Sequence, residues 1–200
     1  MDTTLSAPLH TAQPHVPRVR IGCTECARIH AKTHPDNPTA YGTWCNATNA
    51  LDIARKYQHD HSVDDHRVTV HVLEAEDLPD TGWMSPRRAY NFAGTLAILN
   101  DSQRDIYTAY CTHVANCHMG AFDAEVPKVD TCFVAYAGHF EDVRTFAKTH
   151  ARHDELFADA TDAQFKAISA VLNWDAYITL IEDDLRIVDA PQGGVYVFYA

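Results

Sequence analysis

Residues Thr131 to His150 read TCFVAYAGHFEDVRTFAKTH, and this stretch decides the fold of the second half of the chain. The run from Cys132 to Tyr136 is rich in branched and aromatic residues, which predicts a strand. Gly138 interrupts the run, and a glycine inside a strand pattern indicates a bulge or bend. From Phe140 onward the apolar residues recur at helical spacing. The stretch therefore predicts a strand, a bend and a helix.

The residues before this stretch predict two smaller units. Residues 18–78 read as a β-β-α-β unit, with strands at 18–21, 40–45 and 66–73 and a helix around 51–57. Residues 79–128 read as a helical middle unit. There Ser85 precedes Pro86 as a helix cap, and Asp101 is placed to cap a second helix. Residues 1–17 are rich in Pro, Thr and Ala and predict a flexible tail.

Residues 129–200 form the third predicted unit. Helices are expected to begin at Thr161 or Asp162 and after Asn173, and two strands at 185–188 and 195–198 are joined by a Gly-Gly turn. The predicted fold class is therefore α+β: an elongated chain of three small units, two with short antiparallel sheets plus helices and a helical middle.

The chain is acidic, with 27 Asp and Glu residues against 16 Lys and Arg residues and a net charge of −11. The charge is uneven: from Asp123 to the end there are 14 acidic and 6 basic residues, a net charge of −8. Direct nucleic-acid binding is not expected, because it requires a basic surface. A basic partner suits this composition. With no membrane span and no export signal recognisable, a cytoplasmic location with reduced cysteines is expected.

One group of residues suggests a different function. Cys23, Cys26, His30 and His34 combine two thiols and two imidazoles at short spacing, as a tetrahedral zinc site requires. A metal-binding regulator or hydrolase is therefore the alternative hypothesis, although zinc knuckles place their second ligand pair after a longer loop. Free thiols and no bound metal or cofactor are expected instead. No G-x-S-x-G elbow, phosphate-binding glycine loop or His-Glu-x-x-His motif is present, so no catalytic residue is predicted.

Four ordered motifs resemble the ArdA antirestriction family. AYAGHF at 135–140 resembles its A-Y-x-G-x-aromatic segment, and YGTWCNAT at 41–48 resembles its early strand and helix start. NWDAY at 173–177 and GGVYVF at 193–198 resemble its two late motifs. The order and spacing agree over about residues 18–199. The matching positions are Tyr41, Gly42, Trp44, Tyr136, Gly138, Phe140, Trp174 and Tyr177.

This resemblance implies a non-enzymatic protein of mobile genetic elements or phages that forms homodimers. Its surface carboxylates would stand where the phosphates of B-form DNA lie. They would occupy the DNA-binding groove of type I restriction–modification enzymes, on the methyltransferase and specificity core. The carboxylates expected to be exposed and to contact this partner are Glu141, Asp142, Asp154, Glu155, Asp159, Asp162, Asp175, Glu182, Asp183, Asp184 and Asp189.

Overall fold

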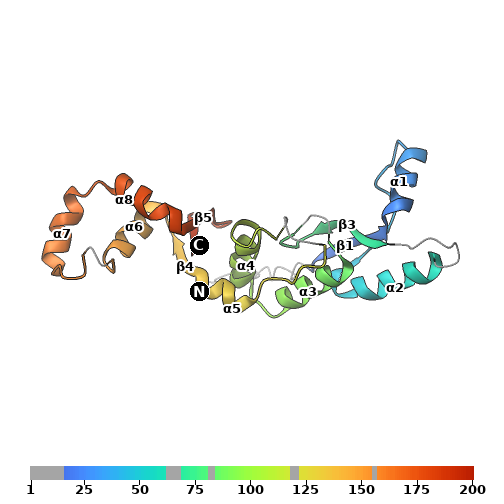
Figure 1. Cartoon of the computed structure of the whole chain (residues 1–200), viewed down its shortest axis with the longest axis horizontal. Helices are drawn as coiled ribbons and strands as arrows, with labels where there is room; N and C mark the ends of the chain where they lie inside the picture. The colour runs from blue at the N-terminus through green and yellow to red at the C-terminus, as the bar shows by residue number, and fades with distance from the viewer. Residues whose placement is uncertain (1–15, 62–68, 81–83, 118–121, 155–156) are drawn as a thin grey trace, which may run out of the picture.

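A computed structural model describes residues 16–61, 69–80, 84–117, 122–154 and 157–200, with side chains described only up to Tyr57 in the first range. The molecule is elongated (Figure 1): one sheet lies on each side of its middle, helices lie between the sheets, and further helices form both ends. The predicted tail is almost entirely outside the described residues, as is Glu155.

The N-terminal sheet has the strand order β2-β1-β3, and both pairings are antiparallel. Its strands are β1 (Arg18–Cys23), β2 (Thr43–Asn46) and β3 (Val70–Glu76). A 3-10 turn, η1 (Ala47–Asn49), leads into α2 (Ala50–His61), which packs on this sheet. Val19 and Ile21 of the central strand are completely buried, because the strand has a neighbour on each side and a helix below.

A helix that the sequence analysis did not predict follows β1. It is α1 (Thr24–Thr33), and none of its residues is buried. It lacks a continuous apolar stripe, which is the signal that identifies a helix in a sequence. Local contacts support it instead: Arg28 and Glu25 form an ion pair one turn apart, and the rings of His30 and His34 stack 4.4 Å apart. The first unit is therefore β-α-β-α-β.

The middle of the chain is helical, as predicted. Ser85 accepts a hydrogen bond from the Arg88 backbone and begins α3 (Pro86–Ala97). The next helix is α4 (Asp101–His113), but its cap is Asn100 and not Asp101. Asn100 exchanges hydrogen bonds with Gln103, forming a complete capping box.

The strand predicted at residues 132–136 is wrong over most of its length. Residues Val129–Ala135 form a short helix, α5, and only the next residue begins strand β4 (Tyr136–Phe140). Cys132 is completely buried whereas Val134 is 83% exposed, which is a helical pattern of burial. The Tyr107 hydroxyl donates to the Pro127 carbonyl oxygen at 2.6 Å and ties the preceding loop to α4. Tertiary packing thus overrides the strand propensity of these residues.

The C-terminal elements agree with the prediction. Strand β4 is followed by α6 (Val143–Ala151), α7 (Asp162–Val171), α8 (Trp174–Ile181), the 3-10 turn η5 (Glu182–Asp184) and the hairpin of β5 (Leu185–Asp189) and β6 (Val195–Tyr199). The antiparallel sheet has the order β4-β6-β5. The strand register shifts between Tyr136 and Gly138, so the predicted irregularity at this glycine is confirmed.

The largest hydrophobic core is continuous along the molecule. It contains side chains from the N-terminal sheet, from the middle helices and from β6. Two smaller clusters lie within the C-terminal part, one around Trp174 and Tyr177 and one around Phe146. The α+β class with two short antiparallel sheets and a helical middle is confirmed. The boundaries at residues 78 and 128 stay predictions.

Candidate functional site

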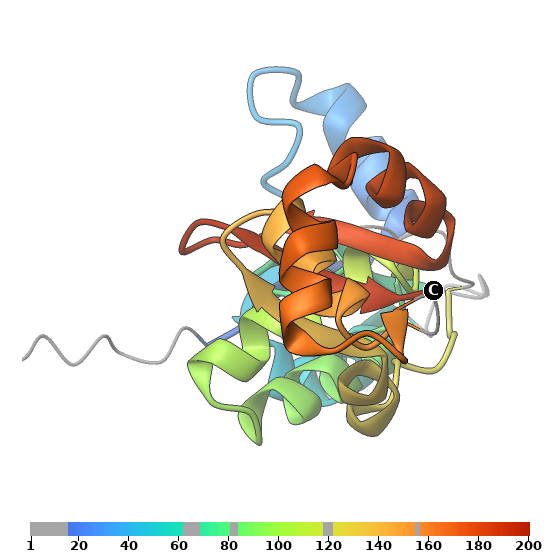
Figure 2. The same cartoon turned by 90° about the vertical axis from the view of Figure 1, so that its left-hand side faces the viewer.

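The predicted partner-binding carboxylates lie mostly on the surface. Asp154 is half-buried, and Glu155 lies outside the described residues. The exposed members are Glu141, Asp142, Asp159, Asp162, Asp175, Glu182, Asp183, Asp184 and Asp189. They come from the turns and helix ends of the C-terminal part, which faces the viewer in Figure 2.

Some of these acids also stabilise helix starts. Asp142 caps α6: its carboxylate accepts a hydrogen bond from the backbone N–H of Thr145 at 2.6 Å. This bond holds the pKa of Asp142 below its ordinary value, so the carboxylate stays charged at neutral pH. Asp162 and Asp175 lie in the first turns of α7 and α8, where the helix dipole favours negative charge.

Two of the acids are engaged within the chain. Asp162 forms an ion pair with Arg152 at 2.7 Å. Asp154 accepts a hydrogen bond from the Tyr177 hydroxyl at 2.8 Å, which links the segment after α6 to α8. The same hydroxyl lies 3.1 Å from Nδ1 of His150. These two carboxylates therefore contribute to the C-terminal fold as well as to its charge.

The longest run of consecutive acidic side chains lies in η5. Glu182, Asp183 and Asp184 are consecutive and exposed, and within the described part of the chain none of them forms an ion pair. The Asp184 carbonyl oxygen accepts from the backbone N–H of Ala200, which fixes this turn against the chain end. The local backbone is therefore held while the three side chains remain in solvent.

The aromatic residues of the family-like motifs serve the core. Trp174 and Tyr177 pack edge to face at 6.0 Å in the C-terminal cluster, and each is 5% exposed. Phe140 packs edge to face on Phe146 at 5.1 Å. Tyr136 contacts the Phe198 ring of the neighbouring strand. These contacts within the chain explain why the four positions are aromatic. They do not identify a binding partner for these residues.

The glycines of these motifs, and Trp44, are likewise explained by the fold. Gly42 has a φ of 107°, and a Cβ there would lie 2.9 Å from the Ile21 carbonyl oxygen. Gly138 has a φ of 145° at the register shift of β4. The Trp44 ring stacks under the guanidinium group of Arg18, 5.2 Å from its centroid.

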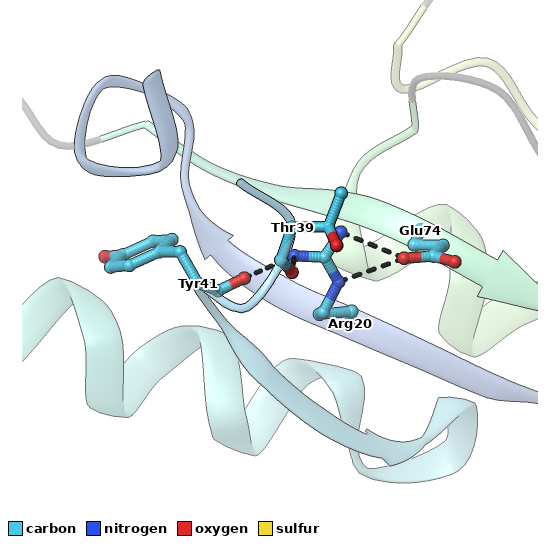
Figure 3. Close-up of polar contacts among 4 residues, drawn as sticks. All are labelled: Arg20, Thr39, Tyr41 and Glu74. Carbon is cyan, nitrogen blue, oxygen red and sulfur yellow. Dashed lines mark hydrogen bonds and ion pairs between the residues drawn. The ribbon is translucent and has the colours of Figure 1, made fainter. Parts of the chain in front are cut away.

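One residue of the metal hypothesis, His30, lies near Tyr41, whose backbone is bound by a buried arginine. Arg20 is 7% exposed and points across β1 toward the segment before β2 (Figure 3). It donates to the carbonyl oxygens of Thr39 and Tyr41 and to the Glu74 carboxylate, at 2.9 Å from Nη2. This network holds the Tyr41 backbone, and the Tyr41 ring lies 6.1 Å from that of His30.

The four residues themselves differ in exposure. Cys23 is buried, Cys26 and His30 are half-buried, and His34 is exposed. Burial raises the pKa of the Cys26 thiol, so this thiol is protonated at neutral pH in the chain alone. In the ranges that the structure describes, no group of three or more His, Cys, Asp or Glu side chains is arranged to hold a metal ion.

The remaining findings are negative. No helix among the described residues is both long and apolar enough to cross a membrane. No protein-family model matches the sequence, and no curated protein or solved structure shows significant similarity to it.

Proposed function

We propose that the protein is an antirestriction protein of the ArdA type, which mimics B-form DNA and occupies the DNA-binding groove of a type I restriction–modification enzyme. The observation that carries the proposal is the exposed, unpaired carboxylate run of η5 within an acidic C-terminal part. The order of the sequence motifs and the elongated α+β fold support it.

The physical basis is electrostatic complementarity. A DNA-binding groove is lined with Lys and Arg and gains affinity from phosphate contacts. A folded surface with exposed carboxylates offers the same sign of charge to these side chains. The carboxylates need no catalytic group or cofactor to act, because occupying the groove is sufficient to exclude DNA.

In this proposal the protein acts in the cytoplasm, where incoming mobile or phage DNA meets the restriction enzyme. It binds the methyltransferase and specificity core, works as a homodimer and does not bind nucleic acid directly. We assign no function to the group of Cys23, Cys26, His30 and His34, because no observation favours a metal site there.

The test is displacement of labelled DNA from a type I methyltransferase core. The protein is expected to release the DNA at low salt, and the concentration needed is expected to rise as salt is added, because ions screen the contacts. The rise is expected to be less steep than for unlabelled DNA, since a folded protein has no condensed counterion layer to release. No displacement at low salt would contradict the proposal.

A further inference from the structure

A groove with positive charge lies at the end of the molecule that is otherwise most acidic. It is open, has a volume of about 620 Å³ and runs between α6 and α7, at the left of Figure 1. The side chains that shape it are Arg144, Lys148, Phe165, Lys166, Ser169 and Trp174.

The charge of this groove is unbalanced. Among the described residues, three cations line it and no carboxylate does, although the chain from Asp123 onward carries a net charge of −8. Arg144, Lys148 and Lys166 are exposed, and among the described residues none of them forms an ion pair. The Asp142 carboxylate acts on the first two through space but is already bound to the Thr145 backbone.

The spacing of the cations adds to this imbalance. Arg144 and Lys148 are four residues apart on one face of α6, about 6 Å apart along its axis, and Arg152 follows at the same interval as the C-cap residue of this helix. Like charges at this spacing destabilise an isolated helix. Arg152 is paired with Asp162, but the other two have no such partner in the part of the chain that the structure describes. A bound anion would remove the repulsion.

The remaining wall of the groove is aromatic and rigid. Trp174 is held by a hydrogen bond from its indole N–H to the Ser169 carbonyl oxygen at 3.1 Å. Phe165 lies under the Arg152 guanidinium group, 5.4 Å from its ring centroid, and packs on Phe157. The groove thus combines exposed cations with an apolar surface held by internal contacts.

We propose that this groove binds a compact anion carrying several phosphates, of the nucleoside di- or triphosphate class. Arg144, Lys148 and Lys166 contact the phosphates, and the flat base lies against the half-buried ring of Phe165, beside the small exposed part of Trp174. The volume is in the range of small-molecule sites. A compact ligand confines its charge to the groove, whereas a long polyanion also meets the surrounding carboxylates. The site is independent of the proposed antirestriction function.

Calorimetry with the full chain at low salt tests the proposal. The probes are the sodium salts of ATP and of tripolyphosphate, and both are expected to bind one to one. The double variant Lys148→Gln/Lys166→Gln is expected to bind each about tenfold more weakly or worse, since two charge-assisted contacts are lost. The matched control is Lys128→Gln/Arg186→Gln, which removes the same charge from exposed positions outside the groove and is expected to bind as the natural protein does.

The two probes separate the contributions to binding. Equal affinity for ATP and tripolyphosphate would show that the phosphates account for recognition. Tighter binding of ATP would show that the aromatic wall also contributes to the affinity. All substituted side chains are exposed, and circular dichroism confirms that both variants are folded. If neither ATP nor tripolyphosphate gives a heat of binding at millimolar concentration, the proposal is overturned. An equal loss in the control variant, or tighter binding of an oligoglutamate peptide than of tripolyphosphate, would overturn it as well.

Discussion

Gly194 occupies a position that no other residue can fill without strain. It lies in the turn between β5 and β6 with a φ of 77°, and a Cβ there would stand 2.3 Å from the Phe140 carbonyl oxygen. The turn therefore brings the hairpin directly against β4. A substitution here strains the backbone and also separates two strands of the C-terminal sheet.

The variant Gly194→Ala is expected to lower the free energy of unfolding by about 2–4 kcal/mol in urea titration, the sum of a strained φ and a backbone clash. The matched control is Gly94→Ala in the middle of α3, where a Cβ meets nothing within 4 Å. This control is expected to raise the free energy of unfolding by about 0.5–1 kcal/mol, because alanine favours a helix. Equal stability of Gly194→Ala and the natural protein would refute the turn geometry.

Cysteine reactivity is set by burial. Cys132 is completely buried, and its surroundings raise the pKa of its thiol to about 12. Cys26 and Cys45 are half-buried. Iodoacetamide at pH 8 is expected to modify these two at least about tenfold faster than Cys132 in the native protein, as read by mass spectrometry, since only accessible thiolates react.

Added Zn²⁺ provides the second arm of this labelling experiment. It is expected to leave the rate at Cys26 unchanged, while urea is expected to make all the cysteines react alike. Protection of Cys26 by zinc at stoichiometric concentration would restore the metal hypothesis for the group with Cys23, His30 and His34.

Elements with a clear apolar period could be predicted from the sequence. The helices α6, α7 and α8 and the β5–β6 hairpin lie where their patterns place them. The strand predicted at α5 was wrong because two signals in the sequence disagree there. The spacing of Val129, Cys132 and Phe133 is helical, whereas the branched and aromatic residue types favour a strand. The polar helix α1 has no buried face, so no pattern marked it.

The candidate site was only partly predictable. Exposure of the acids follows from their charge, because an unpaired carboxylate avoids burial. Their local roles depend on the fold. Asp154 accepts a hydrogen bond from Tyr177, and the sequence does not predict this contact because the two residues are 23 positions apart. The basic groove was also missed. The spacing of Arg144, Lys148 and Arg152 was its signal in the sequence, but Lys166 reaches it from another helix.

The edge strand β5 carries the dimer hypothesis. Among the described strands it lies at an edge of the order β4-β6-β5, and its Ile187 and the neighbouring Tyr199 are exposed. Light scattering at micromolar concentration is expected to give twice the mass of one chain, through a two-fold interface at this hairpin. Ile187→Lys is expected to give monomers, because charge on an edge strand opposes pairing.

The control for the dimer experiment lies far along the chain. Ile98, at the end of α3, is 77% exposed, and Ile98→Lys is expected to leave the dimer intact. A monomer mass for the natural protein would contradict the dimer, and loss of the dimer in both variants would place the interface elsewhere.

The negative charge of the chain is concentrated in its second half. The net charge from Asp123 onward is −8, against −3 for the first 122 residues, so the C-terminal part of the sequence is the more acidic. A DNA-binding groove is attracted by the collective field of several carboxylates more than by any one of them. Single substitutions are therefore expected to have little effect, and grouped substitutions are the informative ones.

The most direct measurement compares two triple variants in the displacement of labelled DNA from a type I methyltransferase core at low salt. Glu182→Gln/Asp183→Asn/Asp184→Asn neutralises η5, and Asp36→Asn/Asp105→Asn/Asp123→Asn neutralises three exposed acids elsewhere. Both remove the same charge. The η5 variant is expected to require about tenfold more protein for half displacement, and the control about as much as the natural chain. Equal potency of the two variants, or no displacement by the natural protein, would contradict the account.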